Sequence, residues 1–263
     1  IAEAGVNRIS IGVQATQTKH LRLMQRTHRW NDIVPRLAWL PGGPIPRYSF
    51  DVIYGLPGMT VTEVKTTLRR LLEFKPQHIS SYELIYEPGT PLHRWLQRYK
   101  QQELPEPDRL AQHKAMGRLL GDHGMYRYEI SNYATPGEES RHNLRYWRGG
   151  DYIGLGIGAA SRFGSEVVNN PRNFEKYRET IHQSFGAAPT RPSEDSDNLS
   201  PPQGIAPPAD IFLRMRTRAG MQLNGHRPDS EWLTNGWMRQ TGDQLEVTNS
   251  GLSFADLYHK RLT

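Results

Sequence analysis

Short segments of alternating apolar and polar residues take turns with longer segments that have helical spacing. The alternating segments are rich in β-branched and aromatic residues, which favour strands. They are residues 8–14 (RISIGVQ), 48–56 (YSFDVIYGL), 78–86 (HISSYELIY) and 126–134 (YRYEISNYA). Helical segments lie between them at 19–40, 60–75 and 109–124. This order predicts an α/β fold with parallel strands and right-handed helical crossovers, either a barrel or part of one.

The helical segments carry start and stop signals. Thr60 or Thr62 can cap the second helix by accepting a hydrogen bond from a first-turn N–H, and Gly124 ends the third. Pro35 must kink or end the first helix, because proline has no N–H to donate. The apolar stripe of the second helix consists of Val64, Leu68, Leu71 and Leu72.

Each of the four predicted strands carries a polar residue within it or at its end. Gln14 ends the first strand, Asp51 lies inside the second, Glu83 falls in the third, and Glu129 and Asn132 fall in the fourth. Each has an ordinary explanation as a helix cap or a solvated loop residue. Ligands of parallel βα proteins collect at the carboxyl ends of the strands, so the recurrence favours a binding site there.

The rest of the chain differs in character. Residues 141–164 (RHNLRYWRGGDYIGLGIGAASRFG) show no helical or strand period. Residues 185–208 are rich in Pro, Ser, Gly and acidic residues, which is typical of a linker. From residue 209 onward, helical segments precede two short strands joined by TGDQ, which predicts a small winged-helix-like module.

Composition limits the classes of function. The net charge is +6 and the pI is near 9.5, so polyanionic partners are conceivable. Basic residues of the C-terminal module are spread over several elements, so we expect no nucleic-acid binding; a DNA-binding winged helix is a remote alternative. The chain has no cysteine, which excludes disulfides and thiolate metal ligands within it. It has no long apolar run and no signal-peptide pattern, so we expect a cytoplasmic protein.

Two motifs in residues 141–164 suggest chemistry. The GLGIG segment fails as a dinucleotide fingerprint, because the third glycine comes one residue early and no acidic residue follows at the required distance on a strand. In HNLRYW, His142 can ligate iron or zinc or hydrogen-bond a carboxylate, and Tyr146 and Trp147 offer flat faces for stacking. The alternative is a structural corner in which these side chains only pack.

Taken in order, GVNRISIGVQ, DVIYGLPG, HISSYELIYEPGTP, YEISNYA and RHNLRYWRGGDYIGLGIGAASR resemble the radical S-adenosylmethionine (SAM) haem chaperones, the HemW-like family. These are relatives of the oxygen-independent coproporphyrinogen III oxidases (HemN). DVIYGLPG is typical of the wider family, and HNLRYW fits the HNxxYW pattern of the chaperones. The resemblance implies the C-terminal part of a partial (βα)6 barrel over residues 1–184, a linker at 185–208 and a winged-helix module at 209–263.

The resemblance also implies roles for individual residues. Gln14, Arg26, Asp51 and Ile85 match positions that contact SAM, and the backbone at Gly154, Gly156 and Gly158 is implied to approach SAM closely. His142, Asn143, Tyr146 and Trp147 fall on the haem motif. The implied function is to bind haem and SAM and to deliver haem to recipient proteins, which can be membrane-associated. Porphyrin oxidation by a coproporphyrinogen III oxidase is the enzymatic alternative, and no residue is assigned a catalytic role.

The chain departs from the family in lacking the CxxxCxxC loop that holds a [4Fe-4S] cluster. Because clusters of this kind need thiolate ligands, no metal ligand is assigned here and the cluster is expected only in a complete protein. The chain begins at Ile1, within what resembles the middle of the family barrel. We therefore expect an N-terminally truncated chain that is inactive alone and exposes a sheet edge.

Overall fold

The computed structural model describes residues 1–86, 89–99, 103–184, 213–223, 228 and 230–252. These residues divide into two compact units, Ile1–Glu139 and Ser140–Thr263, which are described separately below. The predicted linker at 185–208 lies outside the described residues, and the domain boundaries derived from the sequence stay a prediction.

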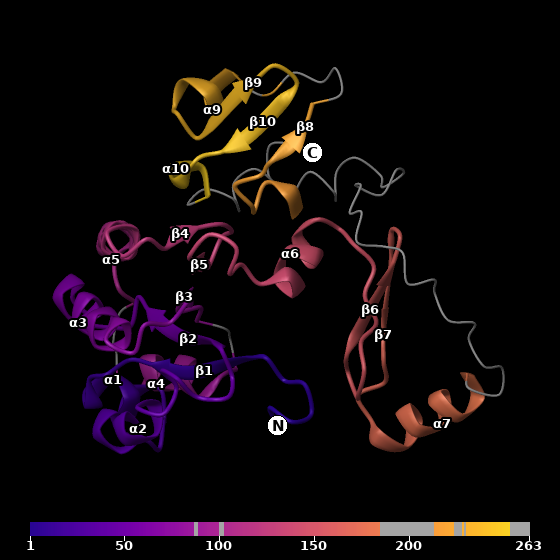
Figure 1. Cartoon of the computed structure of the whole chain (residues 1–263), viewed down its shortest axis with the longest axis horizontal. Helices are drawn as coiled ribbons and strands as arrows, with labels where there is room; N and C mark the ends of the chain where they lie inside the picture. Colours follow the sequence, from indigo (N-terminus) through magenta and orange to yellow (C-terminus); the bar gives the residue numbers. More distant parts are fainter. Residues whose placement is uncertain (87–88, 100–102, 185–212, 224–227, 229, 253–263) are drawn as a thin grey trace. The chain divides into compact units, whose positions relative to one another are not determined.

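The first unit is built on a five-stranded sheet in the order β1-β2-β3-β5-β4 (Figure 1). The strands β1, β2 and β3 are parallel, which confirms the predicted crossover topology for this part. Their bounds, with those of the two remaining strands, are β1 Arg8–Gln14, β2 Arg47–Tyr54, β3 His78–Glu83, β4 Tyr126–Arg127 and β5 Asn132–Ala134. As expected, the sheet has an exposed edge, because β1 pairs with a neighbour on one side only among the described residues.

Residues 126–134 are not one parallel strand, as the sequence predicted, but the two short strands β4 and β5. They pair antiparallel with each other, and β5 pairs antiparallel with β3. The turn between them is held locally: the Glu129 carboxylate accepts a hydrogen bond from the Ser131 N–H, and Arg127 donates to the Ile130 carbonyl. These contacts hold a reversal of the chain at a point where the alternating sequence pattern continues without a break.

In the described part of this unit, five helices connect the strands. They are α1 Thr18–Leu23, α2 Trp30–Leu37, α3 Val61–Leu72, α4 Pro91–Tyr99 and α5 Glu106–Gly121. The helix expected over 19–40 is divided into α1 and α2 by a left-handed residue, Gln25, at φ 55°. Pro35 lies in α2 two residues before its end, and Thr60 caps α3 by accepting from the Glu63 N–H, as predicted. Gly124 takes φ 75° just after α5.

One continuous hydrophobic core stabilises this unit. Alternate residues of β2, Phe50 and Val52, are buried in it, together with Leu68 of α3 and Ile79 of β3. The residues between them, such as Asp51, face the other side of the sheet. The apolar alternation of β2 therefore determines which polar side chains lie on the face of the sheet that is turned away from this core.

The second unit contains two small sheets. A hairpin, β6 Ala160–Phe163 and β7 Glu166–Asn169, follows the short helix α6 Arg141–Trp147 and precedes α7 Phe174–Ser184. Residues 141–164 thus hold a helix and a strand that the sequence did not indicate, since seven residues are too few to display a helical period. The C-terminal module has a three-stranded sheet in the order β8-β10-β9. Its elements are β8 Met221–Gln222, α9 Ser230–Thr234, β9 Met238–Thr241, β10 Gln244–Val247 and α10 Asn249–Leu252.

Candidate functional site

Strand pairing brings two of the predicted SAM residues together in the first unit. In the parallel pair β1–β2, Asp51 lies opposite Gly12 and Gln14 lies opposite Val52, with an irregularity between Gly12 and Gln14. A Cβ at Gly12 would come within 2.6 Å of the Gln14 side-chain amide nitrogen, so the Gln14 side chain lies close over Gly12. The register therefore places the Gln14 amide and the Asp51 carboxylate at the same end of neighbouring strands.

Gln14 has two properties of a ligand-binding residue. Its backbone takes the left-handed conformation at φ 62°, which is uncommon for a residue other than glycine. Its side-chain oxygen Oε1 is buried without a hydrogen-bond partner among the described residues. A buried acceptor without a donor is costly, so this atom fits a ligand that brings hydroxyl or ammonium donors, as SAM would.

Asp51 belongs to a row of polar residues on one face of the sheet. We define the polar strip as Ser10, Asp51, Ser80 and Asn132, which the register places on the same face. Ser49 Oγ donates to Ser10 Oγ, and Ser10 Oγ donates to Asp51 Oδ1, each at 2.8 Å. These bonds orient the carboxylate and leave its second oxygen available to ribose hydroxyls.

Two polar side chains at this face were not singled out for SAM by the sequence. Asn132 Oδ1 and His78 Nδ1 are both buried without a hydrogen-bond partner among the described residues. His78 precedes Ser80 by two residues, and its Nε2 lies 2.8 Å from the Tyr128 hydroxyl. Burial lowers the pKa of His78 to about 3, with a further contribution from the Arg8 charge, so the ring is neutral at pH 7. The period-2 pattern of 78–82 carries the signal that would have placed His78 on the same face as Asp51, opposite Ser49.

Arg26 and Ile85 are less closely connected to this face. Arg26 follows α1, where its backbone N–H donates to the Leu21 carbonyl, and its side chain is exposed. Ile85 follows β3 and is 74% exposed. No hydrogen bond or ion pair among the described residues links either one to Gln14 or Asp51, so their contact with SAM stays a prediction.

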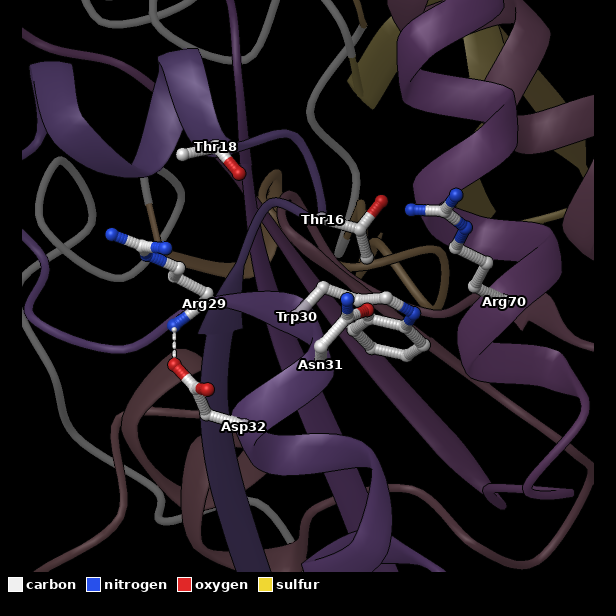
Figure 2. A pocket seen from close by; sticks show the side chains of 7 residues that line it. All are labelled: Thr16, Thr18, Arg29, Trp30, Asn31, Asp32 and Arg70. Carbon is white, nitrogen blue, oxygen red and sulfur yellow. Dashed lines mark hydrogen bonds between the residues drawn. The ribbon is translucent and has the colours of Figure 1, made fainter.

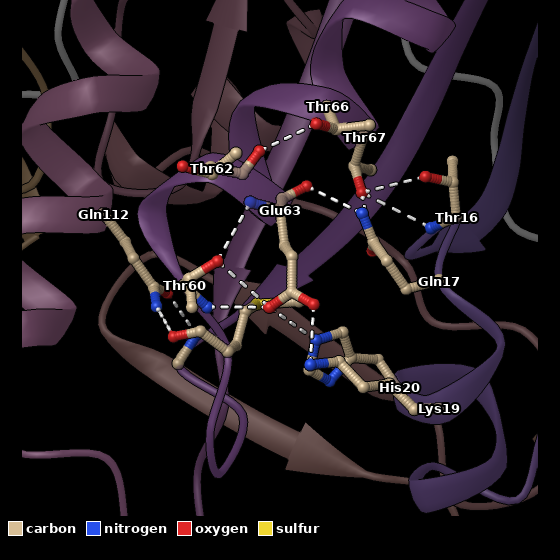
Figure 3. Close-up of polar contacts among 12 residues, drawn as sticks. Thr16, Gln17, Lys19, His20, Thr60, Thr62, Glu63, Thr66, Thr67 and Gln112 are labelled. Carbon is tan, nitrogen blue, oxygen red and sulfur yellow. Dashed lines mark hydrogen bonds and ion pairs between the residues drawn. The ribbon is translucent and has the colours of Figure 1, made fainter.

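The loop after Gln14 is fastened to α3 by a network of polar contacts centred on Glu63 (Figure 3). The Glu63 carboxylate accepts from Lys19 at 2.6 Å, from His20 at 3.2 Å and from the Thr60 N–H at 2.9 Å. Gln17 donates to the Glu63 carbonyl and accepts from Thr67. The sequence indicated the Thr60 cap but not its partner, although T-x-x-E is the capping-box pattern.

The protonation states in this network follow from burial and hydrogen bonding. Burial alone would raise the pKa of Glu63, but the hydrogen bonds from Lys19, Thr60 and His20 outweigh it and lower the pKa to about 2. Burial lowers the pKa of His20 more than the Glu63 contact raises it. At pH 7, therefore, neutral His20 donates its Nε2–H to an ionised Glu63 carboxylate.

A buried glutamine braces the loop after β2. Gln112 of α5 accepts from the Gly55 N–H at 2.9 Å and donates to the Met59 carbonyl at 2.7 Å. The sequence showed no sign of this role, because a single glutamine on a helix is ordinary. Its two bonds fix the YGLPGM turn that joins the strand carrying Asp51 to α3.

In the second unit, the helix α6 presents the HNLRYW residues. The Ser140 side chain caps it by accepting from the Asn143 N–H at 3.3 Å. His142 and Tyr146 are one turn apart, with a hydrogen bond of 2.7 Å between His142 Nε2 and the Tyr146 hydroxyl. Tyr146 also meets Tyr152 edge to face at 4.4 Å between ring centroids, and the Arg216 guanidinium lies 5.4 Å from the centroid of the Trp147 ring.

Three features suit this helix to bind a large planar ligand. None of its residues is buried, and His142 is exposed. The bond to Tyr146 uses Nε2, which leaves Nδ1 as the ring nitrogen without a partner among the described residues. An imidazole nitrogen is a common iron ligand, so His142 fits a haem.

The glycines of GLGIG are held within the second unit. Gly154 donates its N–H to Ser161 Oγ and Gly156 to the Tyr177 hydroxyl, while Asn170 donates to the carbonyls of Gly154 and Gly156. A Cβ on Gly154 would lie 2.1 Å from the Ala160 carbonyl oxygen, so glycine is required there by the hairpin itself. Contact of Gly154, Gly156 and Gly158 with SAM stays a prediction.

The described residues hold no group of three or more His, Asp or Glu side chains that could bind a metal ion, and the whole chain lacks cysteine. A thiolate-bound iron–sulfur cluster therefore does not fit this chain by itself. Among the described helices, none is long and apolar enough to cross a membrane.

Two comparisons define the class of protein. Residues 1–71 match the model of the Radical SAM superfamily. The fold is similar to that of Escherichia coli coproporphyrinogen III oxidase (HemN), a radical SAM enzyme, with a TM-score of 0.69 and 17% identity over 99% of this chain and 65% of that one. Strands β1 and β2 thus lie within the residues that match the Radical SAM model, and the chain as a whole has a HemN-like fold.

Curated relatives narrow the class to one family. The heme chaperone HemW of Synechocystis sp. is 36% identical over 218 residues, which cover 82% of this chain and 52% of that protein. The heme chaperone HemW of Escherichia coli is 31% identical over 261 residues, 95% of this chain and 67% of that protein. The chain belongs to the HemW family of radical SAM proteins. It spans about half the length of the Synechocystis relative.

Proposed function

We propose that this chain is the part of a radical SAM haem chaperone that holds haem at α6 and SAM at the polar strip, for delivery of the haem to a recipient protein. The observation that carries the proposal is the exposed His142–Tyr146 pair on a helix with no buried residue. A buried, fully satisfied histidine would instead have indicated a structural corner. The names of the relatives favour the chaperone over the oxidase, whose similarity to this chain is one of fold.

Different residues of this unit would have different roles in haem binding. His142 offers Nδ1 to the haem iron, while Tyr146 holds Nε2 and so fixes the orientation of the ring. Tyr152 in turn restrains Tyr146 through its edge-to-face contact. Trp147, with Arg216 over its ring, offers an aromatic surface and a cation that suits a propionate.

SAM would be held by the chain's own strand-end residues. Gln14 Oε1 accepts a donor from the ligand, and the free oxygen of Asp51 accepts from hydroxyl groups. When bound next to a reduced cluster, SAM supplies radical chemistry; the thiolates for such a cluster are not in this chain. That the haem is delivered to recipient proteins, including membrane-associated ones, is proposed only because the chain belongs to this family.

The test is a haem titration of the chain followed by its Soret absorption. His142→Ala is expected to weaken haem binding about tenfold or more, because it removes the iron ligand. The matched control is His123→Ala, which removes another exposed histidine from the end of α5. Unchanged haem affinity in His142→Ala, or equal losses in both variants, would contradict the proposal.

Two additions separate the chaperone from the oxidase. Tyr146→Phe should give a smaller loss of affinity than His142→Ala and a changed Soret spectrum, since it leaves the ligand but removes its orienting bond. Iron-free coproporphyrin should compete poorly with haem, because it cannot use His142 as an iron ligand. If coproporphyrin binds as tightly as haem and the haem affinity does not depend on His142, the result favours the hypothesis of a coproporphyrinogen III oxidase.

A further inference from the structure

A cavity of about 420 Å³ lies in the first unit, and its lining includes none of the predicted SAM or haem residues (Figure 2). Its lining comes from the segment after β1 and the first residue of α1, from the start of α2, and from α3. The lining residues on which the argument rests are Thr16, Thr18, Arg29, Trp30, Asp32 and Arg70. A volume of this size holds a small organic molecule.

The cavity has an excess of positive charge. Arg29 is the N-cap residue of α2 and Arg70 belongs to α3, and neither makes an ion pair with any described residue. The acidic lining residue, Asp32, accepts from the Arg29 backbone N–H at 2.9 Å and so serves as a helix cap. Two guanidinium groups without a carboxylate partner in the described part of the chain thus border a concave surface, an arrangement that attracts an anion.

Arg70 is held in position before any ligand arrives. Its guanidinium lies 5.8 Å from the centroid of the Trp30 ring, and Trp30 packs edge to face on Phe74 at 6.2 Å. In the view of Figure 2, Arg29 and Arg70 lie on opposite sides of Trp30, with Thr16 and Thr18 above it. Stacking on the indole limits the rotamers of Arg70, which reduces the entropy lost when it binds.

The Thr18 hydroxyl completes the set of donors. The Thr16 N–H and hydroxyl are both bonded to Thr67 Oγ1 at 3.3 Å, so the β1 end of the cavity is fixed to α3. Together the two guanidiniums and the Thr18 hydroxyl provide more donors than the two oxygens of a carboxylate accept. A phosphate group, with at least three terminal oxygens, matches them better.

We propose that this cavity binds a phosphate group, either as free phosphate or as the phosphate of a small organic ester. Bound there, the anion lies in the positive field of Arg29, at the start of α2, and Arg70 of α3. The site is separate from the proposed function, since none of its lining residues belongs to the predicted SAM or haem sets.

Calorimetric titration of the whole chain at low salt tests the proposal. The ligands are inorganic phosphate, adenosine monophosphate and, as a phosphate-free control, adenosine. Phosphate or the monophosphate is expected to bind and adenosine is not. Tighter binding of the monophosphate identifies an ester site, whereas tighter binding of inorganic phosphate identifies a site for the free anion.

Arginine variants locate the binding. Arg70→Gln and Arg29→Gln should each weaken it about tenfold, the effect of losing one charge-assisted hydrogen bond, and Arg70→Lys should lose less. Arg69→Gln, which removes the exposed neighbouring charge on α3, is the matched control. Absence of phosphate binding at millimolar concentration, equal binding of adenosine, or wild-type affinity in Arg70→Gln with a wild-type circular dichroism spectrum would overturn the proposal.

Discussion

The two units position their candidate ligand residues by different means. In Ile1–Glu139, Gln14 and Asp51 lie on strands whose register is fixed by a continuous core containing Phe50 and Leu68. In the second unit, α6 has no buried residue, and Ile153 and Leu155 in the segment after it are 69% and 83% exposed. The first unit therefore orients its side chains through packing, and the second through short-range hydrogen bonds and aromatic contacts.

The largest expected effect tests the role of packing. Phe50→Ala removes a fully buried ring from β2 and should lower the free energy of unfolding by about 3–5 kcal/mol. The control, Leu155→Ala in the second unit, should change it by less than about 0.5 kcal/mol, because that side chain is mostly in solvent. Urea unfolding followed by circular dichroism measures both. Similar losses in the two variants would remove the contrast between the units.

A smaller effect tests the role of the backbone in the second unit. Gly154→Ala should destabilise the β6–β7 hairpin by about 3 kcal/mol, because the added Cβ meets the Ala160 backbone at 2.1 Å. Gly156→Ala is the control: its φ of +100° is strained for alanine, but no atom lies within 4 Å, so a loss of about 1 kcal/mol is expected. Amide hydrogen exchange over residues 160–169 reports the difference. Equal exchange rates in the two variants would show that the close approach does not matter.

The smallest effect concerns Glu63 and depends on pH. Glu63→Gln should cost about 1–2 kcal/mol near pH 7 through weaker hydrogen bonds from Lys19 and His20. The pKa of Glu63 in the folded chain, about 2, lies below the ordinary value of 4.5, so the unfolded chain takes up this proton first. The ionised Glu63 carboxylate therefore contributes fully to the free energy of unfolding above pH 4.5, and this contribution is lost as the pH falls towards 2.

Urea unfolding at several pH values checks this dependence. Stability should fall less steeply between pH 4.5 and 2 in Glu63→Gln than in the wild type. Glu3→Gln, an exposed carboxylate near the N-terminus, should keep the wild-type slope. An unchanged slope in Glu63→Gln would show that the network leaves the stability of the first unit unaffected.

The strands and helices of the first unit were predictable because burial imposes a period on the sequence. Alternation in 48–54 placed Phe50 in the core and Asp51 on the opposite face, and the fold class is confirmed by the HemN-like structure. The reversal at Glu129 was not predictable, since it depends on bonds among Glu129, Arg127 and Ile130 that no periodic pattern records. The helix α6 was missed because it is short and exposed.

The candidate site was predictable to a lesser degree. Residue type and the family resemblance singled out Gln14, Asp51 and His142, but hydrogen-bond satisfaction is a property of three-dimensional surroundings. That Gln14 Oε1 and Asn132 Oδ1 have no partner among the described residues, and that Tyr146 is bonded to His142 Nε2, could be learned only from the folded structure. The cavity at Arg29 and Arg70 joins residues about forty positions apart, with no local signal to connect them.

The left-handed backbone at Gln14 has a consequence for evolution and design. A glycine would adopt φ 62° without steric cost, whereas glutamine there costs on the order of 1 kcal/mol. Programs that optimise stability alone would replace this residue and gain a more robust β1, at the expense of the amide that the strand end presents. The end of β1 is thus a point where thermostability and chemistry oppose each other, and a stabilised variant of this chain should leave Gln14 untouched.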